Sequence, residues 1–62
     1  MLGIAQDYVG QYGWNVAVNV FVKDLMRGDP ETFKAGYTRE NAVIAASDAF
    51  DISRDEVEGL LT

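Results

Sequence analysis

The segment Asp51–Leu61, DISRDEVEGLL, predicts the start of a helix and sets the fold of the C-terminal half. Ser53 is a common N-cap residue, and Glu56 follows three residues later to complete a capping box. Ile52 and Val57 occupy the two positions of a hydrophobic staple across the same boundary. We therefore expect a short helix to begin near Arg54.

The twelve residues before this segment, RENAVIAASDAF at 39–50, predict a second helix that Thr38 caps. Its apolar side chains recur at helical spacing, with Ile44 to one side of the main arc. The arc consists of Ala42, Val43, Ala46, Ala49 and Phe50. Two helices joined by a tight corner at Asp51 and Ile52 are thus expected.

The segment WNVAVNVFVKDL at 14–25 fits two kinds of structure. With a period of two, its valines and Trp14 share one face of a strand, which residues 4–9 would pair with in a hairpin. With a helical period, Asn15, Asn19 and Lys23 form a polar stripe beside an apolar arc. Gly28 after Arg27 is typical of a helix end, which favours the helix. We predict an all-α fold, a small bundle of three to four helices with a C-terminal helix-corner-helix, formed by a single domain over 1–62. The alternative is an α+β fold with an N-terminal hairpin or a strand at 14–22.

In the helical interpretation, Val16 and Val20 form a second apolar seam outside the main arc of residues 14–25. A chain of 62 residues has little core to cover such a seam, and without Cys it has no disulfide to compensate. We therefore expect a homo-oligomer. The residues predicted to carry self-association are Trp14, Val16, Val20 and Phe21.

The net charge of −5 is concentrated at the C-terminal end. Residues 40–62 contain six acids and a single base, Arg54, whereas the charges of residues 1–39 cancel. An acidic surface repels nucleic-acid phosphates and attracts basic protein surfaces. The acids predicted to face a partner are Asp48, Asp51, Asp55, Glu56 and Glu58.

The segment from Ala46 to Leu60 resembles a helix-turn-helix motif in its hydrophobic spacing. Ala46, Phe50, Ile52, Val57 and Leu60 stand where that motif buries side chains. The resemblance implies a transcription regulator that reads DNA with its second helix. The chain departs from the motif in two ways, because Asp51 replaces the usual turn glycine and the would-be recognition helix is acidic.

The chain contains no His and no Cys, which removes the common metal ligands and most nucleophilic chemistry. The uncharged stretch 8–22 is too short and too polar for a membrane span, so we expect a cytoplasmic protein with no membrane partner. We predict no enzymatic activity and no cofactor. The function predicted is that of a small acidic protein-protein interaction module, an adaptor or inhibitor of the phage or bacterial regulator type. The alternative is the DNA-binding regulator described above.

Overall fold

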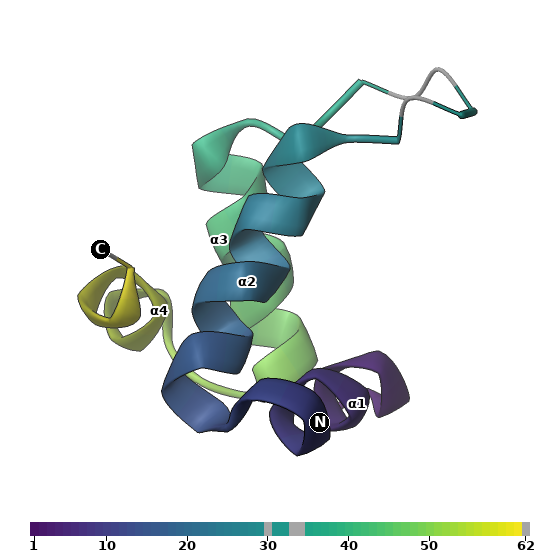
Figure 1. Cartoon of the computed structure of the whole chain (residues 1–62). Helices are drawn as coiled ribbons and strands as arrows, with labels where there is room; N and C mark the ends of the chain where they lie inside the picture. The colour runs from purple at the N-terminus through teal and green to yellow at the C-terminus, as the bar shows by residue number, and fades with distance from the viewer. Residues whose placement is uncertain (30, 33–34, 62) are drawn as a thin grey trace.

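The computed structural model describes residues 1–29, 31–32 and 35–61, and these residues form four helices. The helices are α1 (Gly3–Tyr12), α2 (Trp14–Arg27), α3 (Arg39–Phe50) and α4 (Arg54–Leu60). In Figure 1, α2 and α3 run side by side in opposite directions, α1 lies across their lower end, and α4 packs to one side. The predicted all-α bundle with a C-terminal helix-corner-helix is confirmed.

The two predicted caps in the C-terminal half are present. The Thr38 hydroxyl accepts a hydrogen bond from the Asn41 amide at 3.2 Å, and the Ser53 hydroxyl accepts one from the Glu56 amide at 3.1 Å. Asp51 adopts the left-handed conformation, with φ 60° and ψ 44°, and the Ile52 amide donates to the Ser47 carbonyl at 3.1 Å. The corner is therefore built by local interactions that its own residues supply.

The α+β alternative is wrong, because residues 14–27 form α2. A strand would place Val18 and Phe21 on opposite faces, whereas both are buried in the same core. Residues 4–9, the expected partner strand, lie within α1. Helical spacing alone collects the buried side chains of this segment on the face that packs against α3, and these are Ala17, Val18, Phe21 and Val22.

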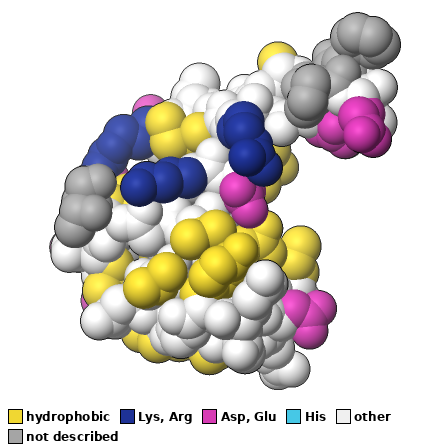
Figure 2. Space-filling view, in the orientation of Figure 1, with side chains coloured by type: hydrophobic (Ala, Val, Ile, Leu, Met, Phe, Trp, Pro, Cys, Tyr) yellow, Lys and Arg dark blue, Asp and Glu magenta, His cyan; other side chains and the backbone are white. Residues whose placement is uncertain are grey.

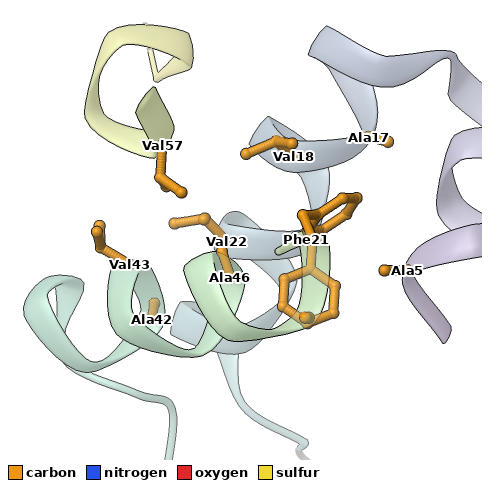
Figure 3. Close-up of a cluster of buried hydrophobic side chains, with 11 residues drawn as sticks. Ala5, Ala17, Val18, Phe21, Val22, Ala42, Val43, Ala46 and Val57 are labelled. Atoms are coloured by element: carbon orange, nitrogen blue, oxygen red, sulfur yellow. The ribbon is translucent and has the colours of Figure 1, made fainter. Parts of the chain in front are cut away.

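Small residues dominate the core, because five of the eleven buried side chains among the described residues are alanines. Figure 3 shows the core side chains of α2, α3 and α4 converging, with Val57 directed toward Val22 and Val43. Phe50 is the largest fully buried residue. Its ring makes edge contacts with Trp14 at 5.6 Å and with Phe21 at 5.3 Å between centroids. Phe21 in turn contacts Tyr8 of α1 at 5.3 Å, so aromatic rings connect three helices.

The connection from α2 to α3 folds back onto the end of α2. Gly28 has φ 77°, and the Tyr37 amide donates to the Leu25 carbonyl at 2.8 Å. Gly36 approaches so closely that a Cβ there would lie 2.6 Å from the Met26 carbonyl carbon and would overlap its oxygen. The short helical turn that Asp29 and Pro30 suggest in the sequence falls partly on Pro30, Phe33 and Lys34, which lie outside the described residues.

Candidate interaction surface

The outer face of α2 carries the apolar seam that the sequence predicts. Val16 is 52% exposed, and Val20, one turn further along, is half-buried. They line a groove of about 380 Å³ with Leu60 from the end of α4. The other lining residues of this α2–α4 groove are Asn15, Asn19 and Lys23. Figure 2 shows an extended hydrophobic area in the lower half of the molecule, with basic side chains above it.

The other two predicted self-association residues lie elsewhere. Trp14 is 37% exposed and places its ring edge against Phe50, so it belongs partly to the core. Phe21 is only 7% exposed and packs between Tyr8 and Phe50, so its side chain is not part of the surface. Helical periodicity places Phe21 with Ala17 and Val18 on the inner face of α2, whereas Val16 and Val20 lie on the outer face.

Leu60 is a groove residue that the sequence did not reveal as such. The Asn19 amide group donates to the Leu60 carbonyl at 3.2 Å, which fixes the end of α4 against α2. The Leu61 amide closes the helix by donating to the carbonyls of Val57 and Glu58 at 3.2 Å. The groove therefore depends on a contact between residues 41 positions apart, which no local pattern encodes.

The predicted partner-facing acids are all exposed but point in different directions. In α4, Asp55 lies opposite the buried Val57, and Glu56 and Glu58 flank it on its two sides. The Glu58 carboxylate already has a partner within the chain, because it pairs with the Arg39 guanidinium at 2.6 Å. The other acids, Asp48 on the solvent face of α3 and Asp51 in the corner, extend the acidic surface beyond α4.

A hydrogen bond from Tyr8 connects α1 to an ion pair within α2, formed by Asp24 and Arg27. The Tyr8 hydroxyl donates to the Asp24 carboxylate at 2.7 Å, and the Arg27 guanidinium lies 3.4 Å from that same carboxylate. The hydrogen bond to Asp24, followed by partial burial, raises the pKa of Tyr8 from 10.0 to about 12. Ionised Tyr8 would place a negative charge against Asp24, so the neutral phenol is the form that the fold retains.

A second depression, the α3–α4 pocket, is not predicted as a site by the sequence, although Val43 belongs to the predicted apolar arc and Glu58 to the predicted partner-facing acids. It has a volume of about 410 Å³ and lies between the first turns of α3 and the length of α4. Val43 is among the lining residues but is only 4% exposed, so the aliphatic portions of the charged side chains supply most of the apolar lining. The remaining lining residues are Arg39, Glu40, Arg54 and Glu58. Arg39 and Glu58 are the residues whose pairing brings the two helices together here.

The helix corner has the burial pattern that its resemblance to a helix-turn-helix implies. Ala46, Phe50 and Val57 are buried, and Ile52 and Leu60 are partly buried. Asp51 takes the left-handed conformation for which the motif usually employs glycine. However, α4 has seven residues and exposes three acids beside one arginine, so its outer face lacks the cations that bind phosphates.

None of the helices in the described part of the chain is long and apolar enough to cross a membrane. Within the same residues, no group of three or more His, Cys, Asp or Glu side chains is placed to hold a metal ion. Comparison with protein-family models, with curated proteins and with solved structures finds no match to this chain.

Proposed function

We propose that this chain is a small, acidic, non-enzymatic protein-interaction module that self-associates through the outer face of α2. In this proposal the acidic half, α3 and α4, binds a basic surface of another protein, and the module acts as an adaptor or inhibitor in the cytoplasm. The observation that carries the proposal is that Val16 is exposed beside Val20 and Leu60. The inner face of the same helix is already buried against the rest of the chain, so this outer apolar face is left uncovered.

A second copy of this chain is large enough to cover the outer face of α2. A standard interface buries about 800 Å² per partner, which is about a fifth of the 4221 Å² surface of this chain. Two-fold symmetry would place the Val16 and Val20 seam of one copy against the same seam of the other. Asn15 and Lys23 border the groove and would form a polar rim around that contact.

The test is the mass of the protein in solution across a concentration series, measured by light scattering or sedimentation. We expect the parent chain to dimerise, and Val16→Asp to shift it to monomer because a carboxylate would be desolvated in the contact. Ile4→Asp is the matched control, because Ile4 is 53% exposed on a different helix and should leave the mass unchanged. A parent chain that remains monomeric at every concentration would refute self-association.

The second candidate function is DNA binding through α4, which the observed helix-corner geometry supports. An electrophoretic shift at low salt separates the two candidates. Sequence-dependent retardation of a DNA duplex would favour the regulator, whereas no retardation is expected for the interaction module because the exposed face of α4 is acidic.

A further inference from the structure

We propose that the α3–α4 pocket binds a free α-amino acid that has an aliphatic side chain. This site is separate from the α2–α4 groove, with which it shares no lining residue. The proposal goes beyond the interaction function and does not depend on self-association.

The shape of the pocket suits a small ligand. Its volume of about 410 Å³ falls within the range of small-molecule sites, and Val43, 4% exposed, lies in its lining. The Arg39–Glu58 pair spans from α3 to α4 at 2.6 Å and closes one wall. The aliphatic portions of the charged side chains add apolar surface to the other walls.

The charges of the pocket select the class of ligand. Arg39 and Glu58 neutralise each other, which leaves Arg54 and Glu40 as the uncompensated charges of the lining. Among the described residues, neither Arg54 nor Glu40 forms an ion pair, so their charged atoms lie more than 4.0 Å apart. A ligand that complements this arrangement carries a carboxylate for Arg54, a cation for Glu40 and an apolar group for the aliphatic lining.

An aliphatic α-amino acid has these three groups on one carbon centre. Its carboxylate can accept a bidentate pair of hydrogen bonds from the Arg54 guanidinium, and its ammonium can donate to Glu40. Because the charged groups of the pocket are exposed, each ion pair contributes little. We expect a dissociation constant on the order of 1 mM for leucine.

The experiment is a two-dimensional NMR titration of the full chain with leucine, N-acetylleucine and leucinamide. Leucine should shift the amide signals of residues 39, 40, 43, 54 and 58 in a saturable manner. Acetylation removes the ammonium and amidation removes the carboxylate, so each derivative should bind about two- to fivefold more weakly than leucine. Absence of saturable shifts with about 20 mM leucine, or equal binding of either derivative, overturns the proposal.

Two variants assign the contacts without relying on loss of binding alone. Glu40→Gln should abolish the preference for leucine over N-acetylleucine, whereas Arg54→Gln should abolish the preference for leucine over leucinamide. Both residues are exposed, so the fold should persist, and the amide spectrum verifies this. Variants that retain both preferences would contradict the assignment. Val16→Asp should leave the titration unchanged, which keeps this test independent of dimerisation.

Discussion

At the scale of single residues, Gly13 is the one residue that links α1 to α2 along the chain, and it has φ 82° and ψ 164°. This conformation is essentially restricted to glycine. We expect Gly13→Ala to lower the free energy of unfolding by about 1–3 kcal/mol because alanine would be strained there. Urea denaturation monitored by circular dichroism measures the change.

Gly59 supplies the matched control, because it lies inside α4 and a Cβ there meets nothing within 4 Å. Gly59→Ala should raise the free energy of unfolding by about 0.5–1 kcal/mol through its better helix propensity. If Gly13→Ala leaves the free energy of unfolding unchanged or raises it, the backbone conformation assigned to Gly13 is incorrect.

Tyr8 provides the pH-dependent prediction. Its pKa is raised from 10.0 to about 12 in the folded chain, so folding favours the neutral phenol. The resulting stabilisation is fully present below pH 10.0 and is lost as the pH rises toward about 12. Absorbance titration of tyrosinate should show one phenol that ionises late. Asp24→Asn should lower the pKa of that phenol, and Tyr8→Phe should remove the late step; a titration without a late step would refute the Tyr8–Asp24 contact.

At the scale of elements, α4 is a seven-residue helix that depends on its cap and its docking. Ser53→Ala removes the hydroxyl that accepts from the Glu56 amide and should cost about 1 kcal/mol of stability. Ser47→Ala is the control, because Ser47 lies inside α3 and its hydroxyl, among the described residues, donates only to the Ile44 carbonyl of the preceding turn. The control should be nearly neutral in thermal denaturation. Equal losses in the two variants would show that the Ser53 cap has no special role.

The helices also differ in how much of each can be predicted from the sequence. The bounds of α3 and α4 follow from local caps at Thr38 and Ser53, and the apolar arc of α3 is buried as predicted. The valine-rich segment of α2 fits the periodicity of both strand and helix, and the local helix-end signal at Gly28 favours the helix. Packing against α3 then buries the face that helical spacing collects. The helix α1 is missed because Gly3 and Gly10 weaken its local signal, while a contact from the Leu2 amide to the Ala49 carbonyl at 2.9 Å holds it in place.

The candidate sites likewise combine features that local sequence patterns predict with features that depend on residues far apart in the chain. Exposure of Val16 is predictable from helical periodicity, because Val16 lies outside the apolar arc of its own helix. The contribution of Leu60 to the groove and the pairing of Arg39 with Glu58 depend on residues far apart in the chain. Helical periodicity already separates Phe21 from the Val16 and Val20 seam, and its contacts with Tyr8 and Phe50 confirm that its side chain lies in the core.

At the scale of the whole molecule, stability is small in total and depends heavily on Phe50. A chain of 62 residues is expected to be stable by about 3–9 kcal/mol. Phe50→Ala removes the ring that contacts Trp14 and Phe21 and should cost about 3–5 kcal/mol. The loss is about a third or more of that stability, so we expect the urea midpoint of this variant, monitored by circular dichroism, to fall by about a third or more. A cooperative transition close to that of the parent chain would show that the aromatic contacts are not central.

The alanines at the helix contacts have a consequence for the sequences that this architecture can accept. Ala5, Ala17, Ala42, Ala46 and Ala49 are each at most 1% exposed. A larger side chain at any of them would push two backbones apart instead of filling a void. In a saturation mutagenesis experiment read out by protein abundance, these five small positions should therefore tolerate as few replacements as the aromatic ones. These five alanines then define the spacing of the helices, and any redesign has to begin from them.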